Sequence, residues 1–130
     1  MSDYWLDLAE TDLERGRLLQ ATVLLGEALR SFVSFMCVFH GAETEGNYYD
    51  PSSSFEDLPF LEWLTFLQGE GVMTFDEVFN YTIIEAKWYR AMGKKEYQPP
   101  NQEALKNSIN ELRRFIRKNW NEMTSTTEDQ

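Results

Sequence analysis

The longest apolar run of the chain, from Thr22 to Phe39, limits what it can fold into more than any other feature. Between Phe32 and Phe39 almost every residue is apolar, so a helix made of this run has no polar face to turn toward water. Such a helix must be surrounded by its own domain, by a partner protein or by lipid. Glu27 and Arg30 interrupt the run well short of the ~20 apolar residues that a membrane span needs. We therefore predict that residues 22–40 form the central helix of a small bundle.

Four further helices are predicted around this run from apolar residues that recur every three or four positions. The expected helices cover residues 3–19, 22–40, 55–68, 74–93 and 101–123. The stretch 42–54 is rich in turn-forming residues and is expected to be a loop. No stretch alternates as a strand does. The sequence thus predicts an all-α, single-domain bundle of about five helices over residues 1–123, followed by a flexible polar tail over residues 124–130.

Side chains that can cap helix ends support these boundaries. Thr74 with Glu77, and Ser53 with Glu56, have the spacing of a capping box, in which each residue bonds the backbone N–H of the other. Asn101 is expected to cap the last helix. Gly16 is expected within the first helix, as a small residue that lets another helix come close.

The predicted helix over residues 74–93 has an apolar stripe that is expected to face the core. Its members are Phe75, Val78, Phe79, Thr82, Ile83, Ala86, Tyr89 and Met92. Trp88 lies off this stripe, beside Lys87, and is therefore expected to face outward. An exposed Trp beside a charge is a common anchor for a partner protein, so Trp88 is a predicted partner-binding residue.

Composition places the chain among globular proteins and argues against binding to nucleic acid. It has 130 residues, 42% of them hydrophobic, and a formal net charge of −10. Residues 1–80 carry 15 acidic and 3 basic side chains, whereas residues 81–130 carry 7 and 9. An acidic surface repels phosphates. An acidic surface of this kind is typical of a soluble protein whose copies repel one another. The alternative is that the acidic surface docks on a basic partner.

The compartment is inferred from cysteine use and from the start of the chain. Cys37 is the only cysteine, so no internal disulfide forms, and the thiol is expected to pack as a small apolar group. The first ten residues are acidic and do not have the pattern of a signal or transit peptide. A cytoplasmic location is expected.

Few residues point to catalysis or to a cofactor. His40 is the only histidine and is expected to close the central helix, where an imidazolium favours the carbonyl end. A metal site or a catalytic triad needs more imidazoles or a neighbouring nucleophile. No nucleotide-binding or hydrolase motif is present, so no cofactor and no metal are expected.

Two groups of basic residues are candidates for a binding surface. They are Lys87, Arg90, Lys94 and Lys95 near the end of the fourth helix, and Arg113, Arg114, Arg117 and Lys118 near the end of the fifth. Each group suits the negative end of its helix dipole. If the two ends meet, they form one positive patch for RNA or for the acidic half of another copy. Tyr48 and Tyr49 in the loop are anchors on the bundle or part of a contact surface.

The first helix resembles that of HEPN domains, which are small all-α bundles of about this length. The pattern is Trp5-x3-Ala9-x3-Leu13-x2-Gly16, with Asp12 before Leu13. The long second helix and the terminal helix, from Ala104/Leu105 to Trp120, fit the same architecture. The resemblance implies dimerisation and partnership with nucleotidyltransferase, toxin–antitoxin or defence proteins.

The ribonuclease members of this family carry Arg-x4-6-His, and this chain departs from that motif. Arg90 is followed by Tyr97 in place of a histidine. A tyrosine with a pKa near ~10 is not a base at neutral pH. The departure predicts a non-catalytic member.

We therefore predict a non-enzymatic, acidic protein–protein interaction module, HEPN-like and homodimeric, with a regulatory or defence-associated role. One alternative is a HEPN-type ribonuclease with an altered site around Arg90 and Tyr97. Another is an acidic mimic that inhibits a nucleic-acid-binding protein. The predicted partner-binding residues are Trp88, Tyr48, Tyr49, Arg90, Lys94, Lys95, Arg113 and Arg117.

Overall fold

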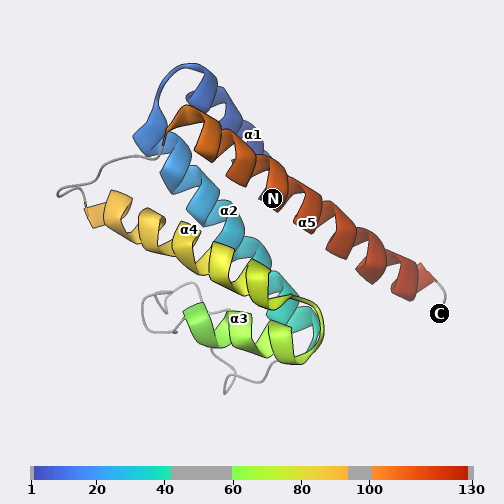
Figure 1. Cartoon of the computed structure of the whole chain (residues 1–130). Coiled ribbons are helices and arrows are strands. Elements are labelled where there is room, and N and C mark those ends of the chain that lie inside the picture. The colour runs from blue at the N-terminus through green and yellow to red at the C-terminus, as the bar shows by residue number, and fades with distance from the viewer. Residues whose placement is uncertain (1, 42–59, 94–100, 129–130) are drawn as a thin grey trace.

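The computed structural model describes residues 2–41, 60–93 and 101–128 of the chain. Over these residues it contains helices only, which confirms the all-α prediction (Figure 1). The helices are α1 (Ser2–Glu14), α2 (Leu18–Phe39), α3 (Phe60–Gly69), α4 (Phe75–Gly93) and α5 (Gln102–Glu128).

Helix α2 is the centre of the bundle, as predicted. It contacts each of the other four helices, while α1 also packs on α5 and α3 packs on α4. Figure 1 shows α1 and α5 on one side of α2, with α3 and α4 on the other. Among the described helices only α2 is long and apolar enough to cross a membrane, and 61% of its apolar window is buried inside the protein. The protein's own helices therefore cover most of this window.

The turn between α1 and α2 differs from the prediction. Helix α1 ends at Glu14, whereas the sequence predicted a helix to residue 19. Gly16 has a φ of 75°, its N–H donates to the Leu13 carbonyl at 3.0 Å, and the Arg17 N–H donates to the Asp12 carbonyl at 2.8 Å. This pair of bonds is a Schellman motif, which needs a left-handed residue that only glycine adopts without strain. Gly16 therefore ends the helix, and its predicted role as a packing residue inside the helix is wrong.

Three predicted caps are present. The Thr74 N–H donates to Glu77 Oε1 at 2.8 Å, and the Glu77 N–H donates to Thr74 Oγ1 at 3.1 Å, which completes the capping box of α4. The Ala104 N–H donates to Asn101 Oδ1 at 2.7 Å at the start of α5. His40 is the C-terminal cap of α2, as predicted.

Two further predicted boundaries concern the start of α3 and the end of α5. The capping pair of Ser53 and Glu56, and the predicted start of α3 at residue 55, lie outside the described residues. Helix α5 continues to Glu128, so the predicted polar tail, from residue 124, is helical over residues 124–128. Adding a turn to an existing helix costs less free energy than starting a new helix, because each added residue gains a backbone hydrogen bond. The last turn of α5 can therefore form without apolar residues.

Helix α4 turns a different face to the core from the one that the sequence predicted. Its buried residues are Val78, Tyr81, Ile84, Trp88 and Ala91. Most of the predicted core stripe is exposed instead, with Val78 as its only buried member and Thr82 half-buried. The prediction that Trp88 faces outward is wrong, because its side chain is 7% exposed.

The reason lies in α2. A Cβ placed on Gly26 would overlap the Cβ, Cγ and Cδ1 atoms of Trp88, so the indole fills the space above this glycine. Trp88 Nε1 donates a hydrogen bond to Glu27 Oε1 at 3.2 Å. The indole is buried with its one donor satisfied, as buried Trp side chains usually are.

The Arg30 guanidinium packs on the same indole. Its guanidinium carbon lies 4.4 Å from the Trp88 ring centre and 5.5 Å from that of Phe60. The Arg30 side chain is 4% exposed and forms an ion pair of 2.9 Å with Glu85, a residue of α4. Burying a cation is unfavourable unless a carboxylate or an aromatic face compensates it, and here both do.

Gly26→Ala tests the contact between α2 and α4. We expect it to lower the free energy of unfolding by about 1–3 kcal/mol, because overpacking against Trp88 outweighs the gain in helix propensity. Gly69→Ala is the matched control, since nothing lies within 4 Å of the added carbon. The control should be neutral or stabilising in urea denaturation. Equal effects of the two substitutions would contradict the packing described.

Glu85→Ala tests the buried cation. The substitution leaves Arg30 buried without its carboxylate, and we expect it to cost about 2–3 kcal/mol in the free energy of unfolding. The double variant Arg30→Met/Glu85→Ala should be more stable than Glu85→Ala alone, because it also removes the buried cation that has lost the Glu85 carboxylate. A double variant that is less stable than Glu85→Ala would show that the ion pair between Arg30 and Glu85 contributes little to the free energy of unfolding.

Candidate functional site

The outward face of α4 carries a continuous apolar stripe. Phe75, Phe79, Ile83, Ala86 and Tyr89, which we call the outer stripe, recur every three or four residues and so share one face of the helix. Phe75 is 69% exposed, Phe79 60%, Ile83 39% and Tyr89 59%. Single exposed apolar residues are ordinary, but a contiguous row of large ones marks an interaction site.

Charges of opposite sign lie at the two ends of the outer stripe. Asp76 is in the first turn of α4 and Arg90 is in its last turn. Both are exposed, and neither has an ion-pair partner among the described residues. Each is placed favourably for the dipole of its own helix. The stripe therefore has an acidic end and a basic end.

A groove runs beside the stripe, between α4 and α5. One part has a volume of about 190 Å³, with Thr22 and Leu25 of α2 among its lining residues. An adjoining part of about 300 Å³ contains Tyr81 and Phe115, whose rings meet edge to face at 5.2 Å. Ile83 belongs both to the groove and to the outer stripe.

The described members of the two basic groups do not meet at one end of the bundle, because α4 and α5 run in opposite directions (Figure 1). Arg114 and Lys118 of α5 line the groove opposite Glu77, near the start of α4. Lys87, near the end of α4, lies instead beside Ala104 at the start of α5. Lys87 therefore lies toward one end of the groove, and Arg114 and Lys118 lie toward the other.

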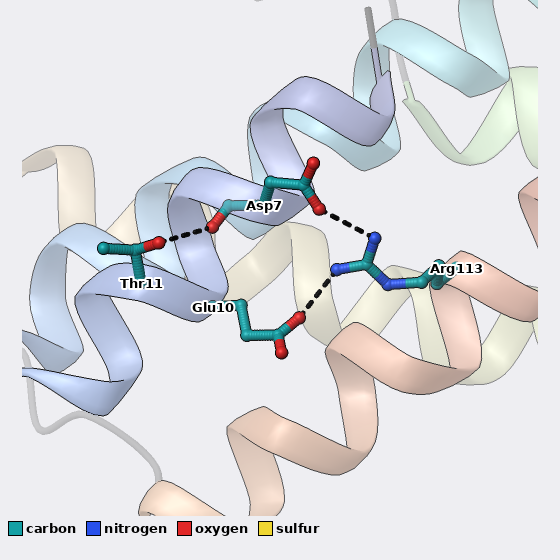
Figure 2. A network of polar contacts seen from close by, with 4 residues as sticks. All are labelled: Asp7, Glu10, Thr11 and Arg113. Carbon is teal, nitrogen blue, oxygen red and sulfur yellow. Dashed lines mark hydrogen bonds and ion pairs between the residues drawn. The ribbon is translucent and has the colours of Figure 1, made fainter.

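Arg113 has a different role from the predicted one. Its guanidinium donates to Asp7 Oδ1 at 2.9 Å and to Glu10 Oε2 at 2.8 Å, and Figure 2 shows it reaching from α5 to both carboxylates of α1. This fork joins α1 to α5, so Arg113 belongs to the bundle and not to a partner surface. Both carboxylates are largely exposed, so the pair contributes about 1 kcal/mol or less.

The other predicted partner-binding residues fall into three groups. Arg90 and Arg117 are exposed, as a binding role requires. Trp88 is buried against Gly26 and is excluded from a surface. Tyr48, Tyr49, Lys94 and Lys95 lie outside the described residues, as does Tyr97.

A second exposed aromatic group lies where α2 and α5 meet. The Phe35 and Trp120 rings are 6.0 Å apart, and Trp120 is 51% exposed. Phe39, in the last turn of α2, is exposed as well. The described helices of the bundle therefore cover the C-terminal end of the central helix only in part.

Two potential nucleophiles are held in the core. Burial raises the pKa of the Cys37 thiol to about 12, and the thiol donates to the Trp63 carbonyl at 3.6 Å. Burial, reinforced by Glu77 and Glu111, also raises the pKa of Tyr81. Both groups therefore stay protonated at neutral pH. Over the described residues, no group of three or more His, Cys, Asp or Glu side chains is placed to hold a metal ion.

The fold and the outer stripe define an acidic, all-α bundle in which α4 is apolar on two faces. Comparison of the chain with protein-family models, with curated proteins and with solved structures finds no match. The functional argument therefore depends on the geometry of this chain.

The raised pKa of Cys37 predicts a pH dependence of stability. The folded protein keeps the thiol proton up to about pH 12, whereas the unfolded chain loses it near 9.0. This contribution to stability is complete below pH 9 and is lost as the pH rises toward 12, by at most about 1 kcal/mol per pH unit. Urea denaturation between pH 8 and 10 should show a steeper loss for the wild type than for Cys37→Ala. Parallel profiles would contradict the burial of the thiol.

Proposed function

We propose that this chain is a non-enzymatic protein–protein interaction module that binds its partner on the outer stripe of α4. The observation that carries the proposal is the row of Phe75, Phe79, Ile83 and Tyr89, each at least 39% exposed, on a helix whose opposite face is already buried. The described core does not use these side chains, so a partner that packs on them would remove them from water.

The chemistry of the stripe suits a protein partner. Covering apolar surface contributes about 25 cal/mol per Å², and an aromatic side chain buries on the order of 150–250 Å² when fully covered. Phe75, Phe79 and Tyr89 are rigid, large side chains that cost little conformational entropy to hold in place. A helix with anchors at this spacing packs well against another helix.

The net charge of −10 fits the same function. It keeps copies of the protein apart at long range, which limits non-specific association through the exposed apolar residues. The outer stripe then selects partners that offer both an apolar face and matching charges for Asp76 and Arg90. We take this to be a docking role, regulatory in character.

The resemblance to HEPN domains, and the defence-associated role that it implies, stay predictions. So do the two alternative functions. A ribonuclease site would have to include Arg90, which is exposed at the end of α4, and Tyr97, which lies outside the described residues. An acidic mimic would use the half of the chain before residue 81.

Affinity capture from an extract of the source cells tests the proposed function. Phe75→Ser/Phe79→Ser removes two anchors that the core does not use, and Leu61→Ser, at a residue of α3 that is 54% exposed, is the matched control. We expect proteins held by the tagged wild type to be held about tenfold less by the double variant and equally by the control. Melting curves should confirm that both variants are folded. Equal capture by the wild type and the double variant would overturn the proposal.

A further inference from the structure

We infer that the partner on the outer stripe is a second copy of this chain, with α4 packed antiparallel on α4 of that copy about a two-fold axis at Ile83. The inference rests on the proposed function, since it names the occupant of the same surface. It is argued from the arrangement of charge, from side-chain size and from exposed area.

The first argument is the symmetry of the charges. Asp76 lies seven residues before Ile83, and Arg90 lies seven residues after it. An antiparallel pair centred on Ile83 brings Asp76 of each copy to Arg90 of the other, which forms two ion pairs. A parallel pair would place like charges together. The described part of the chain offers neither residue an ion-pair partner of its own.

The second argument is that both charges lie on the same flank of the helix. They are fourteen residues apart, close to four turns of 3.6 residues, and both flank the stripe on the side of Ile83. A two-fold axis between antiparallel helices keeps each flank facing the equivalent flank of the other copy. Asp76 and Arg90 can therefore meet across the pair, whereas charges on opposite flanks could not.

The third argument is complementary size. Phe79 lies four residues before Ile83, and Ala86 lies three residues after it. The antiparallel register therefore places the large ring of one copy against the small Ala86 of the other. Such pairing of large and small residues lets two helices come close, as ridges fitting into grooves.

The exposed area sets the expected strength. The four large side chains of the stripe are 39–69% exposed, so covering them would bury on the order of 500 Å² per copy. The total of about 1,000 Å² is at the low end for a specific interface. We therefore expect a reversible dimer with a Kd on the order of 10 μM, and not a permanent one.

Sedimentation equilibrium of the full chain, from about 1 to 500 μM, tests the inference with two charge-reversal variants. Asp76→Arg and Arg90→Asp should each be monomeric at concentrations where the wild type is dimeric, because each places two like-charge pairs in the interface. An equimolar mixture of the two variants should form a heterodimer, because one ion pair, Asp76 with Arg90, is then kept and the other is restored with reversed signs. A parallel pair would place like charges together in the wild type, so a wild-type dimer together with this rescue identifies the antiparallel pair.

Matched controls separate the interface from the change in net charge. Glu103→Arg makes the same change as Asp76→Arg in the first turn of another helix, and Arg117→Asp reverses an exposed arginine of α5. Both should dimerise like the wild type. Phe79→Ser should be monomeric, and Leu61→Ser should be dimeric.

The outcomes distinguish this inference from the proposed function. A wild type that stays monomeric to about 500 μM, or variants that do not rescue each other, would overturn the second copy as the occupant. If the Phe75→Ser/Phe79→Ser variant still loses a captured protein, the stripe serves a different partner and the proposed function stands. A monomer that captures equally with and without the stripe would overturn both, and would indicate that another part of the same chain covers α4.

Discussion

The contact between Trp88 and Gly26 determines which face of α4 turns inward, and the exposed surface of the protein follows from it. The indole occupies the space that a side chain at position 26 would take, and its Nε1 bonds Glu27. Arg30 lies over the same ring and pairs with Glu85. These contacts turn one face of α4 toward α2, and the opposite face, with Phe79 among its members, is left in water.

Local chemistry made much of the fold predictable from the sequence. The capping box of Thr74 and Glu77 and the cap at Asn101 depend on residues three positions apart, so the sequence shows them directly. The central place of α2 follows from an apolar run that no single stripe can accommodate. The turn at Gly16 was missed because a glycine inside an apolar pattern and a glycine that ends a helix have the same local sequence.

The site was harder to predict because it depends on contacts between distant parts of the chain. Helix α4 has apolar residues on two faces, and only the space above Gly26 identifies the inner one. A glycine in the middle of an apolar helix was the available signal, since it marks a place where something large comes close. The predicted positive patch failed for a related reason: it required the ends of α4 and α5 to meet, and antiparallel helices keep them apart.

The charges around Arg30 also explain why α4 does not bury its other apolar face. Turning the helix by half a turn would replace Glu85 and Trp88 near Arg30 by residues around Ile83 and Lys87, on the opposite side of the helix. A buried arginine would then face an aliphatic side chain and a second cation, and would lose its contacts with Glu85 and Trp88. The orientation that leaves the aromatic stripe in water is therefore the one that neutralises the buried charge. The packing around Arg30 inside the bundle therefore explains why the stripe is exposed. A partner on α4 would remove the unfavourable free energy of exposing these apolar side chains to water.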